Sequence, residues 1–476
     1  MRGAIAAGHP LTAQVGADVL RAGGNAVDAC VAASFASWVT ESPLTGPGGG
    51  GFMVVHTARD GRTRVLDFFV AQPSGRAGAM EELEVGFGGE STQLFRIGPA
   101  SVAVPGTVAG LAEAHRLYGS LPWRELMAPA VELARRGVEL TPAQALLHAI
   151  LDVILRHSEE GRRLYGGDAP LPAGARFQSD ELAASLELIG EQGARALYGG
   201  ELGRSVVRWL REQGGPVSER DLRGYRVVRR RPVSVRFRGS VFMSNPPPAS
   251  GGVLVCLGLK RLARGELSVE RVVEALAEQA RARTLPGFAR LLYRGGLAKK
   301  VLGVGGTTHI SVLDAAGNAA SLSISTGSGS GVIVPGTGFQ LNNMLGEHDL
   351  VSHGAPLRAG ARLTSMMTPS IALERGRVRL VLGSAGSVRL RGAVMQVTAN
   401  VLGRGLGVGE AIERPRVHPE ECVVHCEGAD DAARLAELGQ EVVRWRKRNL
   451  FFGGVSAVEP DAAAGDPRRG GQGIVV

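Results

Sequence analysis

The chain has little of what marks several specialised protein classes. Aromatic residues make up 5% of its 476 residues and charged residues 21%, and there are four cysteines. No segment holds the roughly eighteen uninterrupted apolar residues that a membrane-spanning helix needs. The N-terminal stretch MRGAIAAGHPLTAQVG also lacks a long apolar run followed by a cleavage site, so the sequence predicts a cytoplasmic protein that does not act on a membrane.

The cysteines do not suggest a metal site. Cys30 and Cys256 lie in apolar runs and are expected in the core. Cys422 and Cys426 flank His425, but no second ligand pair appears at a spacing typical of zinc. In a strand, Cys422 and Cys426 would share a face while His425 points away. We therefore expect no metal.

The charge is basic, with a formal net charge of +9 that comes mostly from arginine. Arginines cluster at 229–231 and at 444–448, and such clusters can contact nucleic acid. No nucleic-acid motif accompanies either cluster, and solvated strand edges account for both. We expect no nucleic-acid partner.

What the chain does have is glycine, with 69 residues, between segments of clear periodicity. The residues after Asn25 predict a buried helix that Asn25 caps, and 106–225 predicts a run of helices. Strands are predicted at 308–314, 319–325, 331–336, 369–375 and 377–386. Helices that are segregated around such strands predict an α+β fold with αββα layers.

The most informative stretch is Gly305-Gly306-Thr307-Thr308 at the start of a predicted strand. A threonine hydroxyl is a poor nucleophile unless a base lies beside it, and a threonine at a free chain start can use its own α-amine. Glycine before Thr307 suits a cut that frees this amine, because it puts no Cβ near the scissile carbonyl. An ordinary junction between a loop and a strand is the alternative.

Many ordered motifs in the chain resemble the γ-glutamyltranspeptidase family of N-terminal-nucleophile hydrolases. The resemblance runs nearly from end to end. Its motifs include AAGHPLTAQVGADVLRAGGNAVDACVA, GPGGGGFMV, PPPASGG, GGTTHISVLDAAGN, LNNML, RLTSMMTPSIAL, GSAGSVR and GDPRRGGQG.

The resemblance implies a four-layer αββα fold and a precursor that cuts itself between Gly306 and Thr307. Residues 1–306 would form the large subunit and 307–476 the small one, and both would remain in one globular unit, which could itself form a homodimer. Thr307 would attack a small-molecule amide, form an acyl-enzyme and pass the acyl group to water or an amine. This chemistry needs no cofactor.

The resemblance also assigns roles around Thr307. A second hydroxyl on the following strand would be Ser325, bonded to the nucleophile. Thr364 and Ser365 stand where the family has two serines that contact the substrate α-carboxylate. The backbone of Gly386 and Ser387 would stabilise the oxyanion.

Glu347 stands by count where the family binds the substrate α-amine, and Asp349 is the competing candidate. Asn343, with Asn342, would line the pocket. Gly327 stands where the best-known members have an asparagine.

One position departs from the pattern. Family members that act on γ-glutamyl groups pair the substrate α-carboxylate with an arginine, where this chain has Phe69. Arg362 or Arg389 could compensate. The leading expectation is an enzyme that cleaves γ-glutamyl amides such as glutathione. The alternatives are an acylase for a non-glutamyl amide, in the manner of cephalosporin acylases, and an unprocessed protein that binds without catalysis.

Overall fold

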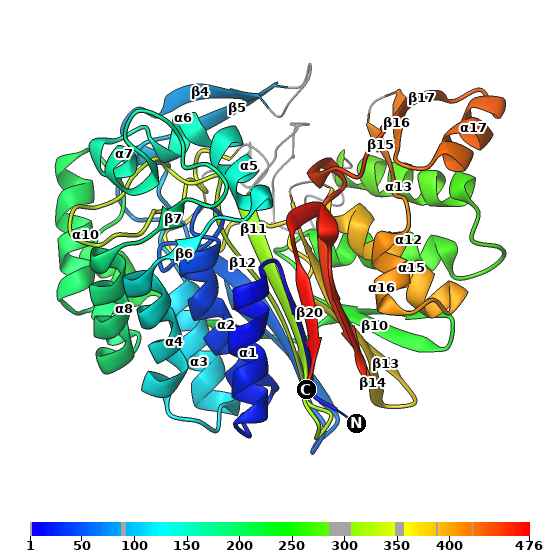
Figure 1. The fold of residues 1–476 in the computed structure, drawn as a ribbon, viewed down its shortest axis with the longest axis horizontal. Helices are drawn as coiled ribbons and strands as arrows, with labels where there is room; N and C mark the ends of the chain where they lie inside the picture. Colours follow the sequence, from blue (N-terminus) through cyan, green and yellow to red (C-terminus); the bar gives the residue numbers. More distant parts are fainter. Residues whose placement is uncertain (1, 87–91, 285–305, 348–356, 387–388, 421) are drawn as a thin grey trace.

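The computed structural model describes residues 2–86, 92–284, 306–347, 357–386, 389–420 and 422–476. Two sheets lie face to face, and helices cover the outer face of each, as Figure 1 shows. The first sheet has the order β20-β1-β11-β12-β2-β3-β8 and the second β19-β18-β14-β13-β10-β9. The predicted α+β fold with four αββα layers is therefore confirmed.

The bounds of the first sheet are β1 (Ala4–Ala7), β2 (Gly50–Thr57), β3 (Arg62–Phe68), β8 (Val228–Arg230), β11 (Gly306–Leu313), β12 (Ala319–Gly327) and β20 (Gln472–Val475). Those of the second are β9 (Val233–Phe237), β10 (Ser240–Ser244), β13 (Ser370–Glu374), β14 (Arg377–Ala385), β18 (Gly454–Glu459) and β19 (Ala462–Gly465). The remaining strands are short and peripheral: β4 (Glu81–Gly86), β5 (Thr92–Ile97), β6 (Val138–Glu139), β7 (Arg176–Phe177), β15 (Val417–Glu420), β16 (Val423–Cys426) and β17 (Glu441–Arg444).

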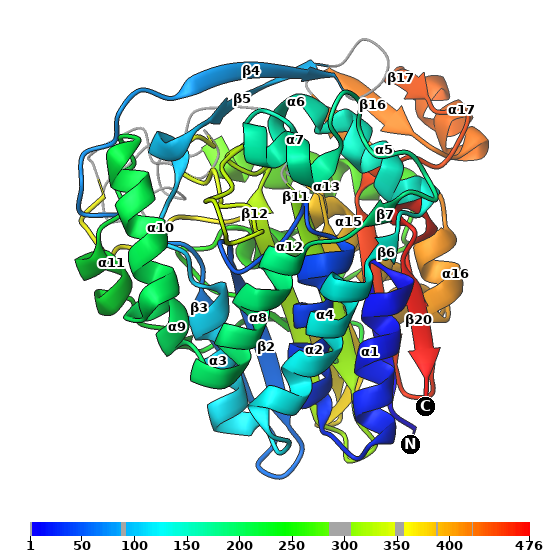
Figure 2. The same ribbon diagram turned by 60° about the vertical axis from the view of Figure 1, so that its left-hand side comes forward.

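Helices on the first sheet's side are seen best in Figure 2. They are α1 (Pro10–Arg21), α2 (Ala26–Thr40), α3 (Thr107–Tyr118), α4 (Trp123–Arg136), α5 (Pro142–Ile150), α6 (Asp152–Leu155), α7 (Glu159–Tyr165), α8 (Asp180–Gln192), α9 (Arg195–Tyr198), α10 (Glu201–Glu212) and α11 (Glu219–Gly224). On the second sheet's side are α12 (Gly251–Leu262), α13 (Val269–Thr284), α15 (Leu390–Arg404), α16 (Val408–Glu413) and α17 (Ala429–Glu437).

Helix α2 connects the outer helices to the first sheet. Asn25 caps it and forms a capping box with Asp28, as the sequence predicts for Asn25. Every residue of α2 is buried, and so is every residue of the neighbouring β11 and β12. The start of β11 therefore lies deep in the fold, where packing on both faces fixes its backbone.

Two predictions made from the sequence are wrong. Residues 331–336 do not form a strand, and Ile333 makes only an isolated bridge with Gln340. Cys422 is exposed and lies outside β16, whereas Cys426 is buried within it, so the two cysteines do not share a face of one strand.

Candidate active site

Thr307 and Thr308 at the start of β11 face opposite sides of the first sheet. The Thr308 hydroxyl donates to Glu41 at 2.6 Å on the helical side. Thr307 lines a cavity with Ala385 and Gly454 of the second sheet, and Glu41 lines the same cavity from the helical side. Thr307 is only 4% exposed, so its side chain sits in a protected position between the sheets.

Ser325 on β12 lies against the peptide bond that precedes Thr307. Its hydroxyl donates to the carbonyl oxygen of Gly306 and accepts from the backbone N–H of Gly327 at 2.8 Å. The resemblance predicts that Ser325 bonds to Thr307, and in the structure its partner is the carbonyl of the adjoining residue, Gly306.

Asn343 and Glu347 lie beside the end of β12. Both side chains accept from the N–H of Ser328, at 3.0 Å and 3.2 Å. Gly327 has a φ of +76°, and a Cβ there would sit 2.1 Å from Asn343 Oδ1. Asn343 thus fills the space that a side chain at 327 would need.

Asn342 does not hydrogen-bond to Ser328, and its side chain instead connects backbone segments of the fold. Its amide donates to the carbonyls of Gly48 and Ala103 and accepts from the N–H of Ala103 at 3.0 Å. Asp349, the competing candidate for the amine-binding acid, lies outside the described residues, as do Gly305 and Ser387.

Thr364 and Ser365 are held by the proline-rich loop that follows β10. The Thr364 hydroxyl donates to the carbonyl of Pro248 at 2.8 Å. Ser365 accepts from Ser250 N–H through its carbonyl at 2.8 Å, and its hydroxyl accepts from Met367 N–H at 3.1 Å. Both hydroxyls are largely buried.

Phe69 directly follows β3 and lies level with Gly50 of β2 and Ser325 of β12 across the first sheet. Gly50 pairs with Ser325, and a Cβ on Gly50 would lie 3.1 Å from the carbonyl carbon of Phe69. The Phe69 ring stacks on Phe52, with centroids 5.4 Å apart. Both rings are fully buried in an apolar cluster that includes Leu363 and Met367. This cluster occupies the region where the family's arginine is expected.

Neither candidate for a compensating arginine is free. Arg362 lies 3.3 Å from Asp67 and stacks on the Tyr225 ring at 4.3 Å. Arg389 pairs with Glu420 at 3.2 Å and stacks on the Phe451 ring at 3.6 Å. Each guanidinium is therefore already engaged with the protein.

Gly386 directly follows β14 and has a φ of +126°, a backbone conformation that favours glycine. A Cβ there would lie 3.7 Å from Nη2 of Arg469. The predicted oxyanion loop thus begins beside a guanidinium that sequence reasoning did not single out.

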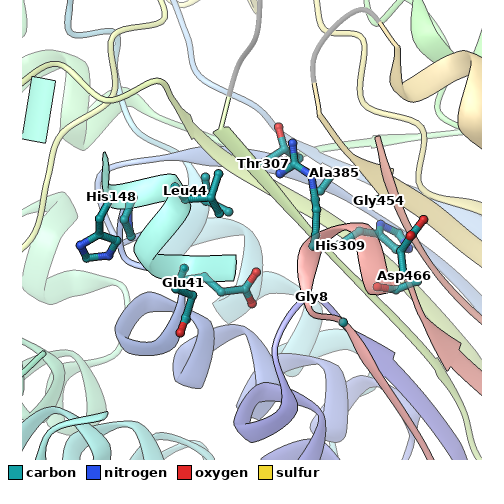
Figure 3. A pocket seen from close by; sticks show the side chains of 15 residues that line it. Gly8, Glu41, Leu44, His148, Thr307, His309, Ala385, Gly454 and Asp466 are labelled. Carbon is teal, nitrogen blue, oxygen red and sulfur yellow. The ribbon is translucent and has the colours of Figure 1, made fainter. Parts of the chain in front are cut away.

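The cavity beside Thr307 opens where β1 ends, and three charged residues that sequence reasoning missed line it: Glu41, Asp466 and Arg469. Figure 3 shows Glu41 and His148 on one side and Thr307, His309 and Asp466 on the other. Arg469 also lines the cavity. The only available signal was indirect, since Glu41 directly follows a helix that is otherwise apolar and Arg469 lies in the GDPRRGGQG motif.

Burial shifts the protonation of these groups. It raises the pKa of the Glu41 carboxyl to about 7 against opposing hydrogen bonds from Thr308 and Thr12. It lowers the pKa of Arg469 to about 10 and that of His309 to about 3. His309 is thus neutral at physiological pH, where its two ring nitrogens contact the hydroxyls of Ser323 and Ser311 at 2.8 Å and 2.9 Å.

Within the described ranges, no group of three or more His, Cys, Asp or Glu residues is arranged to hold a metal ion. In the same part of the chain, no helix is long and apolar enough to cross a membrane.

Comparisons with known proteins agree with this architecture. The family model for gamma-glutamyltranspeptidase matches residues 12–286 and 271–476. The Acylase ACY 1 proenzyme of Pseudomonas sp. (strain SE83) is 33% identical, over 96% of this chain and 89% of its own length. The glutathione hydrolase proenzyme of Pseudomonas aeruginosa is 31% identical, over 100% of this chain and 94% of its own.

Among solved structures, a cephalosporin acylase from Bacillus halodurans superposes with a TM-score of 0.85. It covers 99% of this chain and 95% of its own at 24% identity, which supports the fold. The family match spans nearly the whole chain, and the two curated relatives are named as an acylase and a glutathione hydrolase. The chain therefore belongs to the gamma-glutamyltranspeptidase family and is a hydrolase or acyltransferase of that family.

Proposed function

We propose that the chain is a precursor that cuts itself between Gly306 and Thr307, and that the new N-terminal threonine is the nucleophile of an amide hydrolase or acyltransferase. The observation that carries the proposal is the hydrogen bond from Ser325 to the Gly306 carbonyl, because it activates the one bond whose cleavage frees Thr307. The names of the two curated relatives, both proenzymes, support it further.

In the mature enzyme the α-amine of Thr307 takes the proton of its own hydroxyl, and the hydroxyl oxygen attacks the substrate carbonyl. Backbone N–H groups of Gly386 and Ser387 stabilise the oxyanion. The amine product leaves with a proton, and the acyl-enzyme on Thr307 is then attacked by water or by an acceptor amine. Ser325 remains within reach of the new chain start.

The two products of the cut, residues 1–306 and 307–476, stay together. Each sheet takes strands from both fragments: β1 pairs with β11 and β20 and β2 pairs with β12 in the first sheet, and β10 pairs with β13 in the second. Separation of the fragments would break both sheets, so the mature enzyme is a stable pair of subunits.

Of the two candidate substrates, the geometry favours an amide whose acyl group is not γ-glutamyl. A substrate α-carboxylate beside Phe69 would meet buried aromatic rings instead of an arginine, and Arg362 is committed to Asp67. Loss of one charged hydrogen-bonded partner weakens recognition by about 2–5 kcal/mol. The apolar cluster around Phe69 suits an apolar acyl chain better.

A γ-glutamyl amide such as glutathione is the second candidate, and a specific observation favours it. Glu347 and Asn343 lie together beside Ser325's strand, where a carboxylate and an amide could receive the α-amine of a glutamyl group. The Ser365 hydroxyl accepts from Met367 N–H and can donate to the α-carboxylate, whereas the Thr364 hydroxyl would have to release the Pro248 carbonyl to do so.

Substrates that share the same leaving group and differ only in the acyl group distinguish the two candidates. We would compare γ-glutamyl p-nitroanilide with p-nitroanilides of uncharged acyl chains of similar length, using the wild type and Thr307→Ala. The proposal predicts that kcat/KM is at least about tenfold higher for the uncharged acyl group, which corresponds to about 1.4 kcal/mol. A preference for the γ-glutamyl anilide would establish the second candidate, and activity that persists in Thr307→Ala would contradict the mechanism.

A further inference from the structure

Before the chain is cut, Thr307 has no free α-amine, so its hydroxyl needs another proton acceptor. We propose that Glu41 is this acceptor in the uncut chain, acting through a water molecule in the cavity that it shares with Thr307. The inference rests on the proposed function, because it names the base for the cut after Gly306.

Glu41 is fixed beside the start of β11. It directly follows α2, and its carboxylate accepts hydrogen bonds from Thr308 at 2.6 Å and from Thr12 at 3.3 Å. A Cβ on Gly8 would lie 2.5 Å from Glu41 Oε2, so the backbone after β1 closes over the carboxylate. The carboxylate is therefore bonded to the residue that follows the nucleophile.

Glu41, Thr307 and Arg469 line one cavity, together with other residues, and its volume is about 20 Å³. A cavity of this volume can hold water, and a buried water needs at least two polar partners. All three of these residues are polar. A single water can carry a proton between groups that do not touch directly.

The cation nearest to Glu41 lowers the pKa of its carboxyl and so opposes part of the rise that burial causes. Arg469 faces Glu41 from the C-terminal part of the chain, and its Nε and Nη1 atoms are buried with no hydrogen-bond partner among the described residues. The neighbouring Asp466 is already paired with Arg416 at 2.6 Å and Arg468 at 3.2 Å. Arg469 acts on both carboxylates, and Asp466 has a larger effect on the pKa of Arg469 than Glu41 has.

The other titratable groups near the carboxylate are histidines, and all are neutral. Burial lowers the pKa of His148 on α5 and of His9 before α1 to about 4, and that of His309 on β11 to about 3. Glu41 therefore changes its charge near neutral pH while its neighbours do not, as a group that accepts and returns a proton must.

Cleavage of the bond between Gly306 and Thr307 moves one proton through Glu41 and consumes one water. The proton of the Thr307 hydroxyl passes through the water to Glu41 while the hydroxyl oxygen bonds to the carbonyl carbon of Gly306. The bond between that carbon and the Thr307 nitrogen then breaks, and Glu41 returns the proton to the nitrogen. Water hydrolyses the resulting ester, which frees the carboxylate of Gly306 and the hydroxyl of Thr307.

The experiment measures the rate of cleavage after Gly306 in newly synthesised protein. Full-length protein from a cell-free translation would be moved by gel filtration into buffers from about pH 5.5 to 8.5, and the fragment that starts at Thr307 would be quantified over time. The rate should rise with pH and reach half of its maximum near pH 7. Glu41→Gln should cut about 100-fold more slowly or not at all.

Two variants report on the charge of Glu41 without removing it. Thr308→Val removes a hydrogen bond to the carboxylate and Arg469→Met removes the nearby cation, so each should move the midpoint of the profile upward, and Thr308→Val should move it further. Thr40→Val is the matched control, because Thr40 contacts Thr12 at 2.7 Å and not Glu41, and its midpoint should not move.

These outcomes separate the inference from the proposed function. Normal cutting by Glu41→Gln, with Thr307→Ala blocked, would overturn the role of Glu41 alone. A cut after Gly306 in Thr307→Ala would overturn the proposed function itself. If Glu41→Gln does not fold, the inference is tested by the pH midpoints of cleavage in Arg469→Met and Thr308→Val. Unchanged midpoints in both variants would contradict it.

Discussion

The hydroxyl of Ser325 donates a hydrogen bond to the carbonyl oxygen of Gly306, and the N–H of Gly327 donates to that hydroxyl at 2.8 Å. The contact joins the end of β12 to the first peptide of β11. Strand β12 therefore holds the peptide bond between Gly306 and Thr307 in place. In the cut that we propose, the Thr307 hydroxyl attacks this same carbonyl.

Ser325→Ala should therefore slow the cut. Loss of one donor to a developing oxyanion typically lowers a rate by about 100-fold to 1,000-fold. Ser325→Thr keeps the hydroxyl and should retain most of the rate. The measurement is the time course of the fragment that starts at Thr307. Ser323→Ala is the control, because Ser323 lies on β12 with Ser325 but contacts His309 instead of the Gly306 carbonyl. Equal rates for Ser325→Ala and the wild type would exclude this role.

Gly327→Ala should destabilise the fold through a collision with Asn343. The new Cβ would lie 2.1 Å from Asn343 Oδ1 at a φ of +76°, and overpacking of this kind costs about 1–3 kcal/mol. Gly336 has a φ of +79° with nothing near its Cβ position, so Gly336→Ala reports the backbone strain alone. Urea denaturation of both variants measures the difference.

The double variant Gly327→Ala/Asn343→Ala sharpens this test. Removal of the Asn343 amide makes room for the new Cβ, so the free energy of unfolding should lie above the sum expected from the two single variants. Simple additivity would mean that Asn343 is not what excludes a side chain at 327.

Glu41 should make stability depend on pH. Its pKa is raised to about 7 in the folded chain from an ordinary value of 4.5, so the folded state holds the proton more tightly. The resulting stabilisation is fully present below about pH 4.5 and is lost as pH rises through about 7. Glu41→Gln lacks this loss, so between pH 5 and pH 8 its stability should rise relative to the wild type by about 2–3 kcal/mol.

Urea denaturation of both proteins at the two pH values, in the Thr307→Ala background that keeps the chain uncut, measures this change. Buried histidines such as His309 titrate equally in both proteins and cancel in the comparison. A difference that stays constant from pH 5 to pH 8 would show that Glu41 has an ordinary pKa.

The sequence predicted the layers and most elements because their signals are local. Asn25 and the apolar run after it predict the capped, buried helix α2, and alternation predicts β11, β12, β13 and β14. The strand predicted at 331–336 is wrong because an apolar run without a partner strand does not form a sheet, and Ile333 meets only Gln340.

The candidate site was predicted in part for a similar reason. Thr307 and Ser325 lie on two adjacent strands, so strand register brings them together. Glu41 and Arg469 come from distant parts of the chain, and nothing in either segment indicates that they share a cavity. The filling of the space at Gly327 by Asn343 likewise depends on tertiary packing that no local pattern encodes.

The most direct test of the central claim is the intact mass of the purified protein under denaturing conditions, for the wild type and Thr307→Ala side by side. The account predicts that the wild type separates into two fragments, residues 1–306 and a smaller one that begins at Thr307, and that Thr307→Ala gives one mass for all 476 residues. A single full-length mass for a wild-type protein that hydrolyses amides, or the same two fragments from Thr307→Ala, would contradict it.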